Sequence, residues 1–313
     1  MVRELVVLGT ASQVPTRHRN HNGYLLRWDA AGILFDPGEG TQRQLLLAGI
    51  PSSAVTCICL THFHGDHCLG LPGVLQRMAL DGVTRPVTVA FPAAGAAYFE
   101  RLRHASVFED RLDVRPLPVA PPPDGSTVHV LTEPESSLTV RAASLAHATP
   151  AVGWRVEEDD GRTMLPSRLA AAGVAGPAVG RLQRGGEVEV DGRAVRLEQV
   201  SVERRGQRAA IVMDTGWCEG ARSLAAGADL LVCEATFAQS EEDLAARAGH
   251  LTAGQAGELA NEAGARRLVL THFSQRYRDM RPLLAEARRA FAGDLVVAED
   301  LRRVPVPGRQ VAG

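Results

Sequence analysis

The stretch Thr61-His62-Phe63-His64-Gly65-Asp66-His67 decides the fold of this chain. It follows directly on the apolar run VTCICL at residues 55–60, which predicts a buried strand. That strand would deliver three imidazoles and one carboxylate to the mouth of a sheet, where functional groups are commonly placed. A hydrophilic loop with chance histidines is a poor alternative, because four side chains able to bind a metal fall within residues 62–67.

The spacing inside this stretch predicts a site for two metal ions. His62 and His64 lie two residues apart, so their side chains point the same way on an extended backbone. Gly65 lets the chain turn, and Asp66 and His67 can then address a second point nearby. Imidazole and carboxylate ligands suit zinc, and Mn²⁺ or Fe²⁺ remain alternatives because affinity alone does not select the metal.

The composition is that of an ordinary globular protein with an ample core. Of the 313 residues, 45% are hydrophobic and 22% are charged. No apolar run approaches the length of a membrane span, and the N-terminus resembles a first strand more than a signal peptide. The five cysteines form no CxxC pair, which favours a reduced, cytoplasmic protein. The net charge of −2 means that a nucleic acid would have to meet a local basic patch.

Strands and helices are expected to alternate along most of the chain, which predicts a layered α/β fold. The expected strands are residues 4–8, 24–28, 33–36, 55–60, 87–91, 127–131, 138–145, 209–214, 229–233, 267–270 and 295–298. The expected helices are residues 41–48, 70–80, 251–263 and 281–291. Thr252 and Gln255 form a capping-box pattern that places His250 just before a helix. The proline-rich residues 116–123 are expected to form an extended loop.

Residues 157–206 depart from this pattern. The segment is rich in glycine, arginine and acidic residues, and it has few large apolar side chains. Gly176-Pro177 and Gly185-Gly186 interrupt it further. We therefore expect an inserted, flexible arm, with an ordinary disordered loop as the alternative.

The remaining metal ligands are expected from three other strand ends, because a two-metal site needs about six to eight ligand contacts. His147, Asp214 and His272 each follow an apolar strand and begin a turn. The two oxygens of Asp214 could bridge two cations held about 3.5–4 Å apart. A single histidine at a strand end is more often structural than a ligand. Four other histidines have no comparable setting, namely His18, His21, His104 and His129.

The THxHxDH motif, with His147, Asp214 and His272 at these separations, resembles the metallo-β-lactamase superfamily, and within it the ribonuclease Z family. The resemblance covers nearly the whole chain and implies a four-layer αββα sandwich with an inserted flexible arm. It implies a single domain over residues 1–313, with the arm at residues 157–206 gripping tRNA. By resemblance, one zinc ion is held by His62, His64 and His147 and the other by Asp66, His67 and His272, with Asp214 between them.

Four stretches favour this family over the lactonases, glyoxalase II and β-lactamases that share the metal motif: residues 15–20, 36–42, 176–182 and 233–237. The first resembles a Pro-x-Lys-x-Arg-Asn loop, with Arg17 where lysine is usual. The second resembles the turn after the third strand, and the third resembles the glycine-proline tip of the arm. The last resembles a His-Glu-Ala-Thr segment in which Cys233 replaces the histidine and Glu234 is retained.

The resemblance implies a zinc-dependent endoribonuclease that removes the 3′ trailer from precursor tRNA. Water-driven attack would leave a 3′-hydroxyl on the tRNA and a 5′-phosphate on the trailer. Asp66 is expected to accept a proton besides binding metal, and His250, held by Glu234, is expected to protonate the leaving oxygen. The family also implies a homodimer in which the arm of one subunit holds the tRNA that the other cleaves.

Contacts with RNA are expected from the loop at residues 15–20 and from the arm. Guanidinium groups match phosphate bidentately, although each arm arginine is equally well explained as a solvated charge. The expected substrate-binding residues are Arg17, Arg19, Asn20, Gly176, Pro177, Arg181 and Arg276.

Two other functions remain open. A small-molecule phosphodiesterase or other ester hydrolase would share the same dinuclear core, but it has no use for the arm or for the loop at residues 15–20. A non-enzymatic RNA-binding module is disfavoured, because every expected metal ligand is present. The sequence leaves open whether cleavage occurs before or after an encoded CCA.

Overall fold

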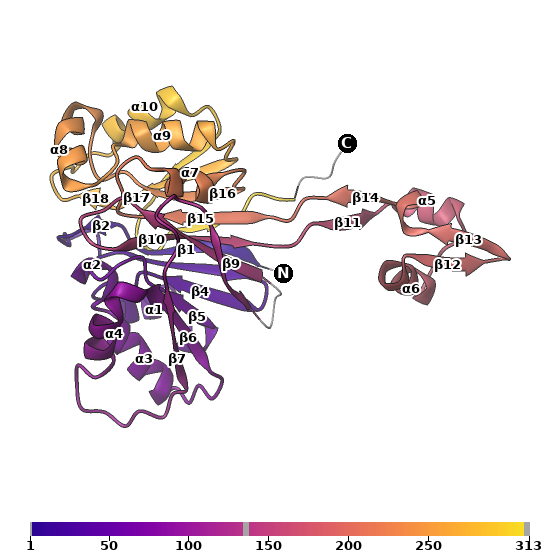
Figure 1. The fold of residues 1–313 in the computed structure, drawn as a ribbon, viewed down its shortest axis with the longest axis horizontal. Coiled ribbons are helices and arrows are strands. Elements are labelled where there is room, and N and C mark those ends of the chain that lie inside the picture. Colours follow the sequence, from indigo (N-terminus) through magenta and orange to yellow (C-terminus); the bar gives the residue numbers. More distant parts are fainter. Residues whose placement is uncertain (1, 134–137, 310–313) are drawn as a thin grey trace. The chain divides into compact units, whose positions relative to one another are not determined.

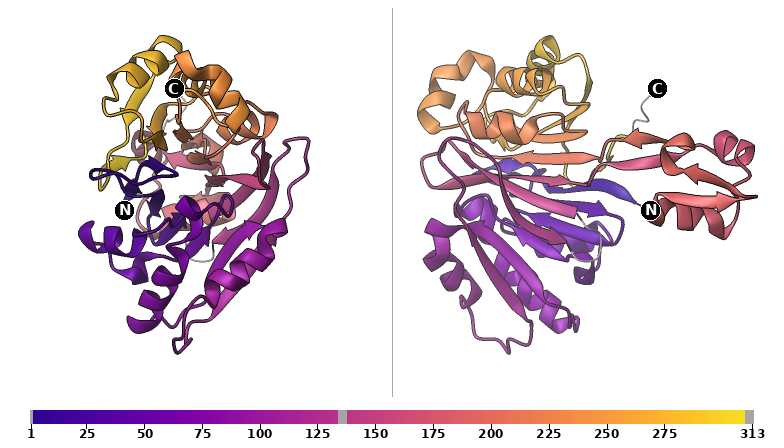
Figure 2. Two further views of the ribbon diagram at one scale, coloured as in Figure 1. Left: turned by 90° about the vertical axis from the view of Figure 1, so that its left-hand side faces the viewer. Right: turned by 45° about the vertical axis from the view of Figure 1, so that its right-hand side comes forward.

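The computed structural model describes residues 2–133 and 138–309 of the chain. The chain forms two compact units, which Figures 1 and 2 colour by sequence. The larger unit comprises the chain up to Glu157 together with Arg208–Pro307, and the smaller is built on Glu158–Gln207. The candidate metal ligands all belong to the larger unit.

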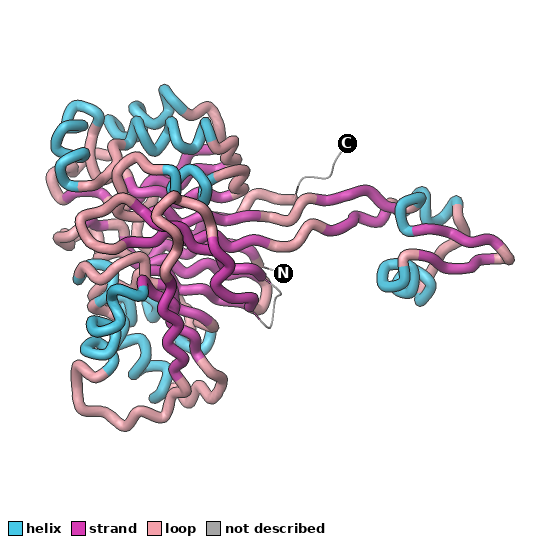
Figure 3. Tube along the Cα trace, in the orientation of Figure 1, coloured by secondary structure: helices cyan, strands magenta, loops and turns pink. Residues whose placement is uncertain are grey.

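Two seven-stranded mixed sheets form the centre of the larger unit. The first has the order β20 (Arg303–Pro305), β1 (Arg3–Gly9), β3 (Gly23–Trp28), β4 (Ala31–Phe35), β5 (Cys57–Cys59), β6 (Val87–Pro92) and β7 (Val114–Val119). The second has the order β19 (Asp294–Val297), β17 (Arg267–Thr271), β16 (Leu230–Glu234), β15 (Arg208–Val212), β10 (Ala151–Glu157), β9 (Leu138–Leu145) and β8 (Val128–Glu133). A short parallel pair joins β2 (Ala11–Ser12) to β18 (Phe273–Ser274). Strands are magenta in Figure 3.

Helices cover the outer faces of both sheets, which gives four layers (Figures 1 and 3). The first sheet packs against α1 (Thr41–Leu47), α3 (Leu71–Leu80) and α4 (Ala96–Arg103). The second packs against α7 (Glu219–Ala225), α9 (Ala253–Glu262) and α10 (Arg281–Ala290). The shorter helices are α2 (Gly65–Cys68), α8 (Glu242–Ala248), η1 (Ser52–Ala54), η2 (Ala93–Gly95) and η4 (Gln239–Glu241). The expected four-layer α/β sandwich is confirmed.

The core lies in three layers that follow from the side-chain alternation along each strand. On β3, Tyr24, Leu26 and Trp28 point between the two sheets, whereas Leu25 points toward the helices of the first sheet. Both faces of each sheet are therefore buried, which explains why strands such as β5 and β16 read as continuous apolar runs. Among the described residues, no helix is both long and apolar enough to cross a lipid bilayer.

Most expected elements are present, and their ends differ from the expected ones by a few residues. Residues 55–60 are a strand only over Cys57–Cys59, and the expected helix at residues 251–263 is α9, whose capping box of Thr252 and Gln255 is formed. The expected loop at residues 116–123 is wrong in part, because β7 runs through Pro116 and Pro118. That strand is the edge of its sheet, where two prolines spaced two apart can both turn the side that lacks an N–H away from β6.

The smaller unit has regular structure and a small core of its own. It contains β11 (Gly161–Met164), α5 (Pro166–Ala171), α6 (Pro177–Gly185), β12 (Glu187–Val190), β13 (Arg193–Arg196), η3 (Leu197–Gln199) and β14 (Ser201–Arg204). The pairs β11–β14 and β12–β13 are antiparallel. Val174, Leu182, Val195 and Val200 are buried together, and further apolar side chains of the unit pack partly buried against them. The segment therefore has a small core, although its composition predicts that it packs poorly.

Candidate metal centre and active site

The histidine motif follows β5 as a turn into α2, and Asp36 holds that turn in place. Asp36 accepts hydrogen bonds from Thr61 N and Thr61 Oγ1, both at 2.7 Å. The backbone of Asp36 has φ +44°, which is uncommon for a residue with a side chain and places its carboxylate beneath the motif. His62 and His64 then lie on the segment leading into α2, while Asp66 and His67 are in its first turn.

The first cluster consists of His62, His64, His147 and Asp214, whose ligand atoms lie within 4.8 Å of one another. His62 Nε2 and His64 Nδ1 are 2.9 Å apart, and His147 Nε2 lies 3.4 Å from His64 Nδ1. Two nitrogens that bind one tetrahedral zinc at about 2.0–2.1 Å are about 3.3 Å apart. The spacing of the three imidazoles therefore suits a single cation.

The second cluster consists of Asp66, His67 and His272, whose ligand atoms also lie within 4.8 Å of one another. His67 Nε2 lies 3.3 Å from His272 Nε2 and 3.4 Å from Asp66 Oδ2. His272 follows β17 and has φ +58°, a strained backbone that turns its ring toward the motif from the other sheet. The seven side chains expected to bind metal are thus brought together in two adjacent groups.

Asp214 lies between the two clusters. Its Oδ2 is 3.6 Å from His62 Nε2, and its Oδ1 is 3.3 Å from His67 Nε2 and 3.2 Å from His272 Nε2. Oδ1 is buried and has no hydrogen-bond partner among the described residues. A buried carboxylate oxygen without a donor is costly unless a cation compensates it, so the donor set fits two metal ions.

The protonation states that the environment favours agree with metal binding for several of these groups. Burial lowers the pKa of His62 well below its usual value and also lowers that of His64, so both rings are neutral and offer a lone pair. Burial opposes ionisation of Asp214, but His272 and His67 hold its pKa well below the usual range. Asp66 is held below the usual range in the same way, chiefly by His67.

Hydrogen bonds to the remote ring nitrogens set the tautomers of three ligands. His67 Nδ1 donates to Asp36 Oδ2 at 2.8 Å, and His147 Nδ1 donates to the Gly249 carbonyl at 2.9 Å. His272 Nδ1 lies 2.8 Å from Thr236 Oγ1. Each of these three rings therefore presents Nε2 to the site. Sequence analysis missed Asp36 and Thr236 as supports, although both lie in stretches that resemble the family.

His250 and Glu234 form a pair beside the first cluster. His250 Nδ1 lies 3.0 and 3.1 Å from the two carboxylate oxygens of Glu234, which is fully buried. Burial alone would lower the pKa of His250, but Glu234 raises it to about 9. His250 Nε2 lies 4.0 Å from Asp214 Oδ2, and with Asp214 and His272 it could also hold a metal ion. The geometry therefore allows His250 to act as a proton donor or as a ligand.

Two neighbouring cavities open beside the clusters. One of about 780 Å³ is lined by His64, Asp66, His147, His250 and Arg276, among others. The second, of about 1090 Å³, is lined by residues of the 15–20 loop and shares Gln275 with the first. A small metal centre alone needs no such space, so the cavities offer room for an extended substrate.

The structure separates the expected RNA contacts of the larger unit into two kinds. Arg17 lines the second cavity, and Arg276 lines the first while pairing with Glu241. Arg19 also lines the second cavity, but its Nη1 donates to Thr10 Oγ1 at 2.8 Å and its guanidinium lies over the Phe273 ring. Asn20 donates from Nδ2 to the Glu39 carbonyl at 2.8 Å. These contacts hold the loop in place, and contact of Arg19 and Asn20 with RNA stays a prediction.

The expected contacts of the arm lie together in the smaller unit. Gly176 precedes α6 with φ +54°, Pro177 occupies its first turn, and Arg181 is exposed on the helix. Glycine is needed at a backbone with this φ, and proline is well tolerated in the first turn. The Gly-Pro pair therefore begins a basic helix that also carries Arg184.

Comparisons with known proteins find relatives of this chain over nearly its whole length. The metallo-beta-lactamase superfamily matches residues 16–179, and the beta-lactamase superfamily domain matches residues 189–273. A ribonuclease Z of Nocardia farcinica is 56% identical over 308 residues, which span 98% of this chain and 99% of that protein. A ribonuclease Z of Salinispora arenicola is 56% identical over 99% of this chain and 98% of its own length.

A solved structure agrees with these relatives. The crystal structure of human tRNase Z, short form, is 25% identical, with a TM-score of 0.70 over 97% of this chain and 100% of that chain. The family is therefore supported by sequence along nearly the whole chain, by the fold and by the two metal-ligand clusters. This chain belongs to the ribonuclease Z family of the metallo-β-lactamase superfamily.

Proposed function

We propose that this chain, a metal-dependent ribonuclease Z that processes the 3′ end of tRNA, cleaves the RNA backbone by attack of water. The products would be tRNA with a 3′-hydroxyl and a trailer with a 5′-phosphate. The observation that carries the proposal is the buried Asp214 carboxylate, whose two oxygens face one ligand cluster each. This arrangement suits two cations held about 3.5–4 Å apart, the separation used for phosphoester hydrolysis.

The metals proposed are two Zn²⁺ per subunit, with Mn²⁺ or Fe²⁺ as alternatives. His62, His64 and His147 would hold one, Asp66, His67 and His272 would hold the other, and Asp214 would contact both. When bound, such ions lower the pKa of water from 15.7 to about 7 and stabilise negative charge on phosphate. The imidazole-rich donor set favours zinc over the hard cations that prefer only oxygen ligands.

Asp66 and His250 are the proposed proton-handling residues. Gln13 N donates to Asp66 Oδ2 at 2.7 Å, which holds that carboxylate toward the second cluster. Its lowered pKa makes Asp66 a weak base, so it contributes more as a ligand than as a proton acceptor. His250 stands on the side of the first cluster, with Glu234 keeping its ring protonated and oriented to donate to the leaving 3′-oxygen.

RNA binding is proposed for exposed arginines of both units. Arg17 and Arg276 line the cavities beside the metal ligands, where phosphates flanking the cleavage site would pass. In the smaller unit, Gly176, Pro177 and Arg181 would contact the body of the tRNA. In this proposal the larger unit cleaves the RNA and the smaller unit binds the folded tRNA. The protein could then select tRNA by its shape, without base-specific contacts at the metals.

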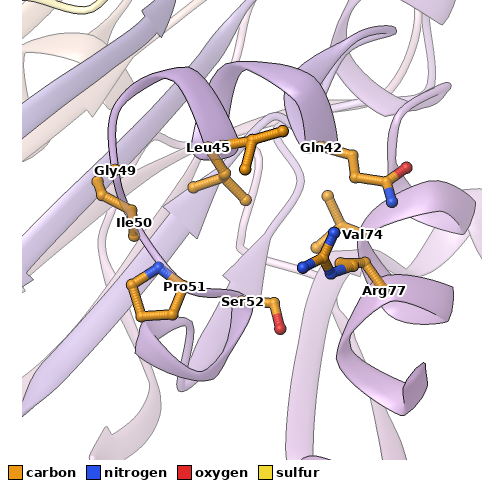
Figure 4. A pocket seen from close by; sticks show the side chains of 9 residues that line it. Gln42, Leu45, Gly49, Ile50, Pro51, Ser52, Val74 and Arg77 are labelled. Carbon is orange, nitrogen blue, oxygen red and sulfur yellow. The ribbon is translucent and has the colours of Figure 1, made fainter. Parts of the chain in front are cut away.

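A homodimer is also proposed, with the arm of one subunit holding the tRNA that the other cleaves. Leu46 and Leu47 on α1 are 66% and 51% exposed, although leucine is usually buried. Leu46 borders an apolar pocket of about 250 Å³ between α1 and α3, shown in Figure 4. This surface is proposed as the contact between subunits. A cytoplasmic location is proposed because the five cysteines are free thiols.

The proposal is tested by incubating the zinc-loaded protein with a precursor tRNA and mapping the cut. Cleavage beside the discriminator base is expected, and Asp214→Ala should abolish it because both clusters lose a ligand. A variant with Glu262→Gln, an exposed change on α9, serves as the control and should cleave normally. Activity on a small ester but none on the precursor would contradict the proposal and favour a small-molecule hydrolase.

A further inference from the structure

Trp217 is an exposed tryptophan in the turn that follows Asp214. It lies three residues after that carboxylate, between β15 and α7. Trp217 is 41% exposed, whereas the other two tryptophans, Trp28 and Trp154, are 1% and 0% exposed in the core. A single exposed apolar side chain is common on protein surfaces, so exposure alone assigns it no role. Its position beside the metal ligands is what calls for an explanation.

Hydrogen bonds fasten this turn to the turn that carries His147. β10 and β15 are antiparallel neighbours, so the turn before β10 and the turn after β15 lie at the same edge of the second sheet (Figure 1). Ala146 N donates to Thr215 Oγ1 at 3.1 Å, and Gly216 N donates to the Ala146 carbonyl at 2.8 Å. Trp217 therefore adjoins a turn that carries a ligand of the first cluster.

The residues on either side of Trp217 are held in place. Thr215 is fully buried, and its N–H donates to Glu234 Oε1 at 2.7 Å. Cys218 packs partly buried against the core on the helix side of the second sheet. The Trp217 indole itself makes no hydrogen bond, ring contact or cation contact with the described part of the chain. An aromatic ring on an anchored turn loses little conformational freedom when it binds a partner.

The leaving oxygen of the proposed reaction departs on the same side of the site. His250, the proposed proton donor to that oxygen, has its ring centroid 5.1 Å from that of His147. The oxygen belongs to the last nucleotide of the tRNA, because the cut falls beside the discriminator base. That base is unpaired, so its face is available for stacking on an aromatic side chain. The discriminator nucleotide is therefore the part of the RNA that lies nearest to the turn carrying Trp217.

We propose that Trp217 binds precursor tRNA by stacking on the unpaired base at which the RNA is cut. This inference rests on the proposed function and adds a residue that recognises the end of the acceptor stem. Every base has a face that stacks on an aromatic ring, and loss of such a ring lowers affinity by about 5–150-fold. Trp217 would thus help to place the scissile phosphate over the metal ligands whatever the base.

The experiment compares zinc-loaded variants on two precursor tRNAs, one with the discriminator base and one in which that nucleotide is abasic. On the normal precursor, Trp217→Ala should lower kcat/KM by about 5–150-fold. Trp217→Phe should lower it by less than about fivefold, because a phenyl ring still stacks. On the abasic precursor, the unsubstituted protein and Trp217→Ala should differ by less than about twofold, because the stacking partner is already absent.

A control variant and a binding measurement complete the test. Val107→Ala truncates an exposed apolar side chain that lines neither cavity beside the ligands, and it should cleave both precursors like the unsubstituted protein. Tryptophan fluorescence reports chiefly on Trp217 when RNA binds, because Trp28 and Trp154 are buried. A tRNA that ends at the discriminator nucleotide should quench this emission, and the same tRNA with an abasic end should quench it less. Trp217→Phe should abolish that difference.

The inference is overturned if Trp217→Ala cleaves the normal precursor as well as the unsubstituted protein does, or if it costs as much on the abasic precursor as on the normal one. It is also overturned if Trp217→Phe is as costly as Trp217→Ala, or if quenching is the same with and without the base. Normal cleavage with any of these results would remove this inference alone. If the unsubstituted protein did not cleave the precursor, the proposed function would fall and this inference with it.

Discussion

Glu234→Gln is the substitution that most sharply tests the proposed proton donor. Burial by itself would lower the pKa of His250, but the Glu234 carboxylate at 3.0 Å raises it to about 9. Glutamine has nearly the same shape and can still accept a hydrogen bond from His250, but it lacks the charge. The substitution should therefore lower the pKa of His250 at least to its ordinary value of about 6.5.

The size of the effect follows from the fraction of His250 that is protonated. With a pKa near 9 the ring is about 90% protonated at pH 8, and with a pKa near 6.5 it is about 3% protonated. Activity that depends on the protonated ring should therefore fall about thirtyfold at pH 8. At pH 6 His250 is largely protonated in both the unsubstituted protein and Glu234→Gln, so their activities should differ by less than about twofold. The raised pKa of His250 thus supports activity between about pH 6.5 and about pH 9.

The assay is the pH dependence of kcat/KM for precursor tRNA, with metal content measured on the same preparations. The alkaline fall in activity should move to lower pH by about 2.5 units in Glu234→Gln. Metal content matters because Glu234 also accepts hydrogen bonds from Thr215 N and from Thr236, which contacts His272. An unshifted alkaline limb with two metals bound would show that Glu234 does not tune His250, and the proposed donor would lose its support.

Three further predictions concern His250, the arm and the dimer. His250→Ala should slow cleavage by about 10²–10⁴-fold while two metals remain bound; loss of a metal would make His250 a ligand. Deleting residues 176–186 should raise KM for precursor tRNA and spare hydrolysis of bis(p-nitrophenyl) phosphate, and an equal loss of both would count against a separate binding arm. Replacing both Leu46 and Leu47 by glutamate should convert a dimer into monomers by light scattering, because charge would be buried in the contact. An unchanged mass would place the dimer contact elsewhere.

Much of the site could be predicted because metal ligands must be particular residue types at strand ends. His62, His64, Asp66 and His67 are recognisable from spacing alone, and the expected partners from other strands do meet them in the structure. Parallel strands such as β15, β16 and β17 bring distant turns to one edge, which is why separate apolar runs could be combined into one centre.

Features that depend on contacts between residues distant in the sequence were harder to predict from the sequence. The guanidinium of Arg19 contacts Thr10 and the Phe273 ring, which no local pattern reveals. Tyr24 looks like any aromatic core residue until Thr271 is seen opposite it. The prolines of β7 argue against a strand until that strand is known to be an edge.

The chemical identity of the product ends tests the central claim most directly. Precursor tRNA cleaved by the zinc-loaded protein would be analysed for the 3′ end of the tRNA and the 5′ end of the trailer. Attack by water at the site gathered around Asp214 predicts a 3′-hydroxyl on the tRNA and a 5′-phosphate on the trailer, with activity lost on chelation and restored by zinc. A 2′,3′-cyclic phosphate on the tRNA, or cleavage that survives complete metal removal, would contradict the account.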